Sequence, residues 1–138
     1  MNGVAAIIQL LAADTGIQTI IDVDATPSRI TGGVLSRNVT LPALAVQEIS
    51  SVDRNIPNPG TYRHVTDRVQ VTGMARTYPD LVELMQAVTA ACGDTFPTVS
   101  GLSRVVVHTD GAGPDFMDDQ ASLFLKTQDF RVSYTETR

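Results

Sequence analysis

The chain has 138 residues and a mass of 14.8 kDa, with 43% hydrophobic and 18% charged residues. These values exclude a disordered chain and predict a single domain, residues 1–138, with a core of its own. The formal net charge of −5 argues against a dedicated nucleic-acid binder, because phosphate binding relies on clustered Lys and Arg.

Residues 4–11 carry apolar side chains at helical spacing and predict an amphipathic helix, with Gly16 as a left-handed stop. Residues 17–23 fit either a continued helix after a break or an extended segment. Residues 29–39 hold the Gly32-Gly33 pair between short apolar runs, which fits a bent strand or a hairpin with a glycine turn.

Pro42 opens a predicted strand at residues 43–51, since proline is tolerated at the first position of a strand. Residues 52–65 are polar and contain two prolines, so we expect a long loop, and loops of this length tend to be functional. Alternating apolar residues at 68–75 predict the next strand, with one face against a helix and the other facing outward.

Residues 78–92 give the clearest helical pattern, with an apolar stripe, Thr77 as N-cap and Pro79 near the first turn. Cys92 ends the stripe, and we expect it to be a small buried hydrophobe. It is the only cysteine, so an intrachain disulfide is excluded. Gly93 ends the helix.

A strand at residues 102–109, an acidic loop at 110–119 and a closing strand at 121–134 complete the chain. The closing strand fits either one long strand or a strand with a bulge, and a bulge is attractive because strict alternation would bury Lys126 and Gln128 beside the apolar positions. The fold class predicted is α+β, a largely antiparallel sheet of four to five strands with two amphipathic helices packed on one face.

Few residues suggest catalysis. His64 and His108 have Asp67 and Asp110 close in sequence, but no placed nucleophile accompanies them, and we expect surface histidines. The acidic loop lacks the alternating oxygen ligands and distal Glu of a calcium site. We therefore expect no catalytic residue, no cofactor and no metal site.

Both predicted loops are candidates for docking. A loose basic cluster in and beside the first loop would contact DNA phosphates or an acidic protein neighbour, or would simply be solvated. The candidate docking residues are Arg54, Asn55, Arg63, His64, Arg68, Asp110, Asp115, Asp118 and Asp119.

The N-terminus has no basic region or cleavage site of the secretory type. Its apolar run at residues 4–13 is broken by Gln9 and is too short to span a bilayer. We expect a protein that folds in a reducing cytoplasm and has no membrane partner.

Several short segments, in this order and spacing, resemble the tail-completion or tail-terminator family of long-tailed bacteriophages and gene-transfer particles. The resemblance covers most of the chain and rests on Arg29-Ile30, Leu41-Pro42, the Arg-Val-Gln-Val strand at 68–71, Tyr78-Pro79-Asp80 and residues 128–134.

The resemblance implies a structural virion protein, not an enzyme, that assembles as a homo-oligomeric ring, typically a hexamer. Such a ring ends the tail tube at the tail-neck junction, contacts the tail tube protein and the head connector or stopper protein, and lets DNA pass in transit. It is assembled in the host bacterial cytoplasm. Three alternatives stay open: a head-completion or head–tail joining adaptor on the portal side, a small metal-dependent hydrolase, and a monomeric binding module.

Overall fold

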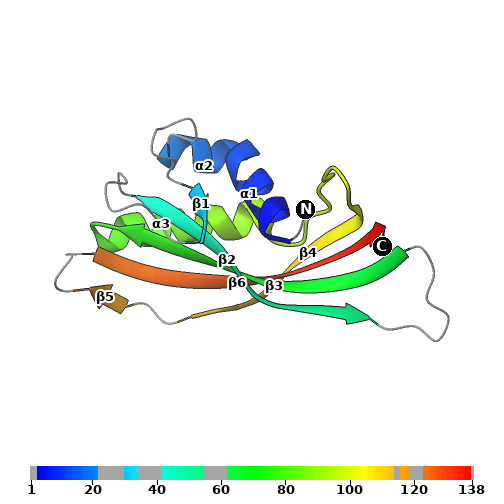
Figure 1. The fold of residues 1–138 in the computed structure, drawn as a ribbon. Helices are drawn as coiled ribbons and strands as arrows, with labels where there is room; N and C mark the ends of the chain where they lie inside the picture. Colours follow the sequence, from blue (N-terminus) through cyan, green and yellow to red (C-terminus); the bar gives the residue numbers. More distant parts are fainter. Residues whose placement is uncertain are drawn as a thin grey trace.

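The computed structural model describes residues 3–21, 30–33, 42–54, 62–113, 116–118 and 123–137. These residues form three helices and a six-stranded sheet, and the helices lie on one side of the sheet (Figure 1). The elements are α1 (Gly3–Ala13), α2 (Thr15–Ile20), β1 (Ile30–Gly32), β2 (Ala43–Arg54), β3 (Tyr62–Ala75), α3 (Tyr78–Cys92), β4 (Ser103–Ala112), β5 (Phe116–Asp118) and β6 (Leu123–Thr137). The predicted α+β class is confirmed. Helices α1 and α3 contact the strands, and α2 packs on these two helices.

The strand order is β1-β2-β3-β6-β4, with β5 also paired to β6. The pairs β2–β3, β3–β6, β4–β6 and β5–β6 are antiparallel, whereas β1 runs parallel to β2. Within the segment 29–39, residues 30–32 form the strand β1, whereas the hairpin alternative needs a second strand after the glycine pair, which falls on residues outside those described. Its glycine pair ends β1, where Gly33 has φ +86° and donates to the Val46 carbonyl at 2.7 Å. Residues 34–39 lie outside the described residues.

The N-terminal helical region consists of two helices separated by one residue. Asp14 caps α2, accepting from the Ile17 N–H at 3.1 Å. Gly16 therefore lies inside α2, and its predicted role as a left-handed stop is wrong. Of the ambiguous segment 17–23, residues 17–20 are helical and Ile21 has extended backbone, while residues 22 and 23 lie outside the described residues.

Helix α3 has the bounds that the sequence predicts. The Thr77 hydroxyl accepts from the Asp80 N–H at 3.4 Å, Pro79 lies in the first turn, and Gly93 caps the end. The helix buries one stripe, consisting of Leu81, Leu84, Met85, Val88, Ala91 and Cys92. Burial raises the pKa of the Cys92 thiol to about 12, which confirms an inert, buried cysteine.

The long polar loop predicted at residues 52–65 is wrong at both ends. Val52 to Arg54 continue β2, and β3 begins at Tyr62. The two strands pair as far as Arg54 with His64, so residues 55–61 are the part that remains outside the described residues. We call residues 47–54 with 62–66 the arm. It projects beyond the helices at the end of the sheet where the chain terminates (Figure 1).

The closing strand is continuous, so the alternative of one long strand is confirmed and the alternative of a bulge in this strand is wrong. β6 pairs with β3 without a register shift, from Tyr62–Thr137 to Ala75–Phe124. Its two register shifts occur against β4, where the extra residues belong to β4. Gln128 is consequently buried and Lys126 half-buried on the helix-facing side. The predicted acidic loop is also partly strand, since Asp110 lies in β4 and Asp118 in β5.

Candidate interaction surfaces

A buried carboxylate ties the start of α1 to the sheet. Asp67 on β3 is fully buried and accepts hydrogen bonds from the Gly3 N–H at 2.8 Å, the Tyr134 hydroxyl at 2.9 Å and the Ser51 hydroxyl at 2.5 Å. Its negative charge lies at the positive end of the α1 dipole. Desolvation and the bond to Asp67 raise the pKa of Tyr134. Asp67 is therefore structural and does not orient His64.

Glu48 on β2 belongs to the same neighbourhood. Partial desolvation raises its pKa, and the nearby charge of Asp67 raises it further. Two carboxyl groups so close together favour the protonated form of the more exposed one. Glu48 and Asp67 are not part of a metal-binding group, since the described residues contain no group of three or more His, Cys, Asp or Glu that could hold a metal ion.

The face of the sheet opposite the helices carries paired charges. Arg68 contacts Asp129 at 2.6 Å and Asp110 at 3.6 Å, and Arg131 contacts Asp110 at 3.1 Å. These four side chains come from three neighbouring strands. Because each cation has a carboxylate partner, this face offers no free cluster of positive charge.

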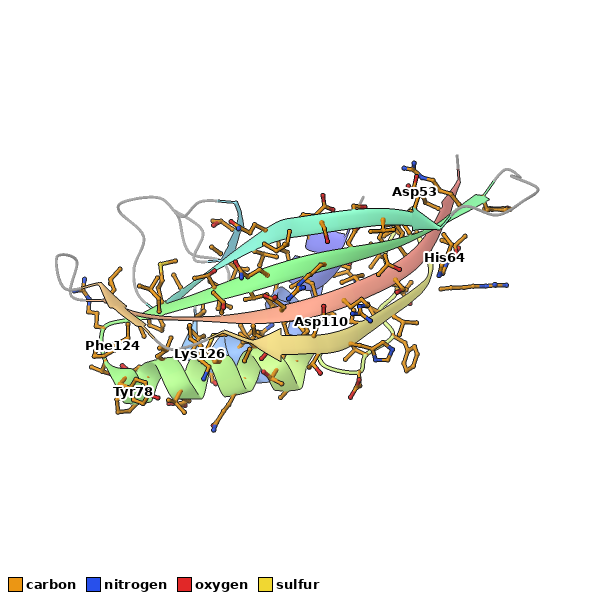
Figure 2. All side chains as sticks on the ribbon, turned by 90° about the horizontal axis from the view of Figure 1, so that it is seen from below. Asp53, His64, Tyr78, Asp110, Phe124 and Lys126 are labelled. Atoms are coloured by element: carbon orange, nitrogen blue, oxygen red, sulfur yellow. The ribbon has the colours of Figure 1, made fainter. Side chains whose placement is uncertain are left out.

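The predicted basic cluster is divided by the sheet. Arg63 lies on the arm and pairs with Asp53 at 3.3 Å and with Glu136, while Arg68 belongs to the network on the face opposite the helices. Arg63 and His64 thus lie on a strand and not in a loop. Figure 2 shows Asp53 and His64 at the arm and Asp110 near the middle of the sheet.

Neither histidine has the partner that its sequence neighbours suggested. His64 Nδ1 lies 3.1 Å from the Thr135 hydroxyl, and His108 Nδ1 lies 3.0 Å from an Asp94 carboxylate oxygen. Both rings are exposed, as expected, and β6 separates their strands. No catalytic grouping involving them is present in the part of the chain that the structure describes.

The remaining candidate docking residues are untested by the structure. Arg54 and Asp118 end strands, but their side chains are outside the described residues. Asn55, Asp115 and Asp119 lie outside the described residues altogether. The docking role of all nine candidates therefore stays a prediction.

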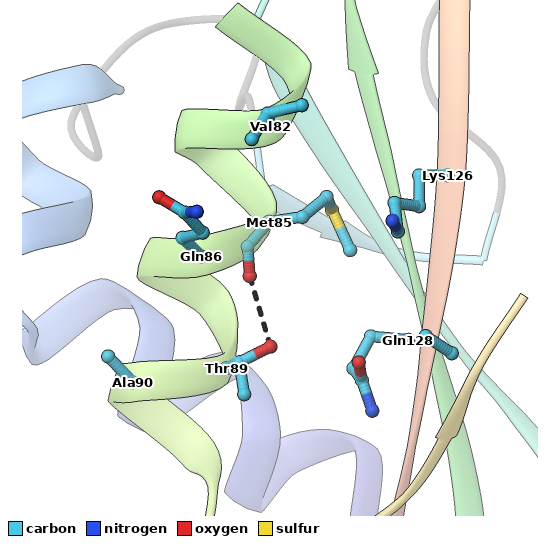
Figure 3. A pocket seen from close by; sticks show the side chains of 8 residues that line it. Val82, Met85, Gln86, Thr89, Ala90, Lys126 and Gln128 are labelled. Carbon is cyan, nitrogen blue, oxygen red and sulfur yellow. Dashed lines mark hydrogen bonds between the residues drawn. The ribbon is translucent and has the colours of Figure 1, made fainter. Parts of the chain in front are cut away.

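An apolar groove of about 490 Å³ lies between α3 and the helix-facing side of β6 (Figure 3). Lys126 and Gln128 border it from the sheet, and the Gln128 amide donates to the Gly111 carbonyl at 3.0 Å. The helix contributes Val82, Met85, Gln86, Thr89 and Ala90. The sequence contained a signal for this groove, because Lys126 and Gln128 alternate in step with the apolar positions Phe124 and Phe130 and would therefore point to the buried side. We interpreted this pattern as favouring a bulge.

A second hollow, of about 420 Å³, lies at the other end of the sheet, beside the arm. It is lined by Tyr62, Ser103, Arg104 and Thr135, from the ends of β3, β4 and β6. The Ser103 hydroxyl donates to the Thr135 carbonyl at 3.3 Å. Arg104 has φ +53°, which non-glycine residues seldom adopt. Sequence reasoning missed this site, because the strained backbone of Arg104 has no sequence signature.

The described helices include none that is long and apolar enough to cross a membrane. No protein-family model and no curated protein matches the chain. Among solved structures, its fold is similar to that of a chain in the virion of a native gene transfer agent (GTA) particle, with a TM-score of 0.72. The match covers 95% of this chain and 92% of that chain at 14% sequence identity. A likeness at this level of identity shows the fold.

Proposed function

We propose that this chain is a structural protein of a virion, and that it forms a ring ending the tail tube at its head-proximal side. The ring would stop tube growth and contact the tail tube protein on one side and the head connector on the other. The observation that carries the proposal is the fold likeness to a chain of a gene transfer agent virion, which extends over 95% of this chain. The fold-wide match also supports treating residues 1–138 as one domain.

The surfaces of the subunit support an assembly role. The arm carries exposed apolar side chains, Val52 and Tyr62. The edge of β2 beyond Val46 has no partner strand within the described residues. A long open edge with apolar side chains is a liability for a monomer and is protected when a neighbouring subunit covers it.

The distribution of charge supports passage of DNA without tight binding. The chain carries a net charge of −5, and Arg68 and Arg131 on the face opposite the helices are held by carboxylates. Tight binding of duplex DNA requires several cations free to replace counterions along the phosphates. A ring of such subunits would let a genome slide through its centre.

Gold-labelled antibodies against the chain, applied to purified particles, test the location. We expect one cluster of label per particle at the junction of head and tail, with unlabelled pre-immune serum as the control. Label on heads that lack tails, but not on free tails, would instead assign the chain to a portal-side adaptor. Particles without the chain would contradict a virion role.

A further inference from the structure

No carboxylate among the described residues forms an ion pair with Arg104. Among the described arginines, Arg63, Arg68 and Arg131 pair with carboxylates, whereas no described carboxylate pairs with Arg104 or Arg76. Arg104 is also exposed and has left-handed backbone next to a register shift of β4. Such a conformation in a non-glycine residue is often found where a side chain is held for a contact.

The hollow around Arg104 fits a carboxylate with an apolar neighbour. Besides the guanidinium, it offers the Tyr62 hydroxyl, while the Ser103 hydroxyl already donates to the Thr135 carbonyl and the Thr135 hydroxyl already contacts His64 Nδ1. No acidic residue is among the described residues that line it. Tyr62 is 61% exposed, so the apolar face of its ring is open to a partner. A guanidinium in a fork geometry beside a hydroxyl donor suits a carboxylate oxygen pair.

The same chain offers a complementary surface at the start of α3. Asp80 and Glu83 are exposed and three residues apart, which places them on one side of the helix. Tyr78 beside them is 44% exposed, and Arg76 is the nearby cation that reduces, without cancelling, their negative charge. No described cation forms an ion pair with Asp80 or Glu83.

These two surfaces lie at opposite ends of the long axis of the subunit. Figure 1 shows α3 starting at one end, whereas β3 and β4 start at the other, and Figure 2 places Tyr78 and His64 at these opposite ends. A contact between two different surfaces is head-to-tail. It therefore builds a closed ring or an open filament and not a two-fold dimer.

We propose that the hollow at Arg104 receives Asp80 and Glu83 of a second copy of this chain, joining copies head-to-tail. The inference rests on the proposed function in that both require self-association, and it names the residues that carry it. A nucleic acid is the less suitable occupant, because the described lining of the hollow holds a single cation and the chain has a net charge of −5, which together give little phosphate affinity.

Charge reversal tests the contact in the purified full chain. Sedimentation velocity over a concentration series at low salt should show oligomers of the wild type. Arg104→Glu should raise their dissociation constant at least about tenfold, because attraction is replaced by repulsion. Adding Glu83→Arg to Arg104→Glu should recover most of the loss. Arg76→Glu makes the same change in charge beside Asp80 and Glu83, where it adds to the attraction for Arg104, so it should not weaken assembly, whereas a non-specific effect of added negative charge would weaken it.

Cross-linking tests the direction of the contact. Cys92 is the only cysteine and is buried, so the native chain should react little with a short bis-maleimide. A chain with both Ser103→Cys and Gln86→Cys keeps Arg104, Asp80 and Glu83 and should give a ladder of covalent multimers, while Ser103→Cys alone should stay monomeric. Dimers from Ser103→Cys alone would indicate a two-fold contact and overturn the proposal.

Three further results would overturn it. They are a wild type that stays monomeric throughout, an Arg104→Glu variant that assembles like the wild type, and a double reversal that recovers nothing. Binding of a DNA duplex probe that Arg104→Glu abolishes, with assembly unchanged, would assign the hollow to nucleic acid instead. These experiments use the isolated protein. If they show no contact through Arg104 while gold-labelled antibodies still mark the junction of head and tail, the contact is rejected and the proposed function stands.

Discussion

At the scale of single residues, the molecule depends on one buried charge. Asp67 gathers the start of α1, the β2 residue Ser51 and the β6 residue Tyr134 at one point in the core. Gly3 is required there because a Cβ at that position would lie 2.9 Å from the Asp67 Cβ. The carboxylate accepts three donors, which an amide or an apolar side chain cannot do.

Asp67→Asn tests the role of this buried carboxylate, because asparagine has nearly the same side-chain shape as aspartate. The amide loses the charge at the start of α1, its oxygen accepts more weakly from the Gly3 N–H and the Tyr134 hydroxyl, and its NH2 group faces the Ser51 hydroxyl, so we expect the free energy of unfolding to fall by about 1–3 kcal/mol. Urea unfolding followed by circular dichroism measures it. Asp80→Asn, at an exposed position, is the control and should change stability by less than about 0.5 kcal/mol. Equal stability of both variants would show that the bonds of Asp67 are dispensable.

Glu48 predicts the sign of a pH effect. Its pKa is raised in the folded state by desolvation and by Asp67, so the folded state binds its proton more tightly than the unfolded state. The stability it provides is thus present below its unfolded pKa, near 4.5, and is lost as the pH rises through the folded value. Glu48→Gln should therefore gain stability relative to the wild type as the pH rises from 4 to 7. A reversed trend for Glu48→Gln would contradict the assigned cause.

At the scale of elements, the sequence specified helix α3 best. Its N-cap, its proline in the first turn and its apolar stripe agree with one another, and the observed bounds follow them. The α2 start was missed, because Asp14 was interpreted as part of a helix end although it caps a new helix. A parallel strand such as β1 pairs through long-range contacts that no local pattern reveals.

The outer part of the arm, residues 52–54 with 62–66, was missed for a different reason, whereas residues 47–51 were predicted as strand. Residues 47–53 of β2 are exposed, so no buried face marks them as strand. Cross-strand pairs such as Arg63 with Asp53 accompany the ladder there in place of a buried face. On β6 a polar residue is buried where the sequence favoured an apolar one. Gln128 lies on the helix-facing side, and its amide donates to the Gly111 and Asp129 carbonyls.

Leu84→Ala tests the packing of α3. The side chain is fully buried in the main core, and its loss should reduce the free energy of unfolding by about 2–5 kcal/mol. The melting temperature, measured by calorimetry, should fall accordingly. Gln86→Ala, on the exposed side of the same helix, should leave it nearly unchanged. A Leu84→Ala chain as stable as the wild type would show that this helix face is not the core face.

At the scale of the whole molecule, the sheet has one face covered by helices and one polar face with paired charges, and the arm extends beyond both. Sequence patterns predicted the fold class and the absence of clear catalytic motifs. The spatial sites could not be predicted in this way, because the hollow at Arg104 joins residues from the ends of three strands. Of the nine candidate docking residues, the structure brings Arg68 and Asp110 together and places Arg63 with partners on the arm.

The central claim is that this chain ends a tail tube, and the length distribution of tails in a strain with its gene deleted tests it most directly. Electron micrographs should show tails of irregular, excessive length beside full heads that lack tails, and the wild-type gene supplied in trans should restore both. Tails of normal length beside heads that leak DNA would move the protein to the head side of the neck. Normal, infectious particles would contradict the account.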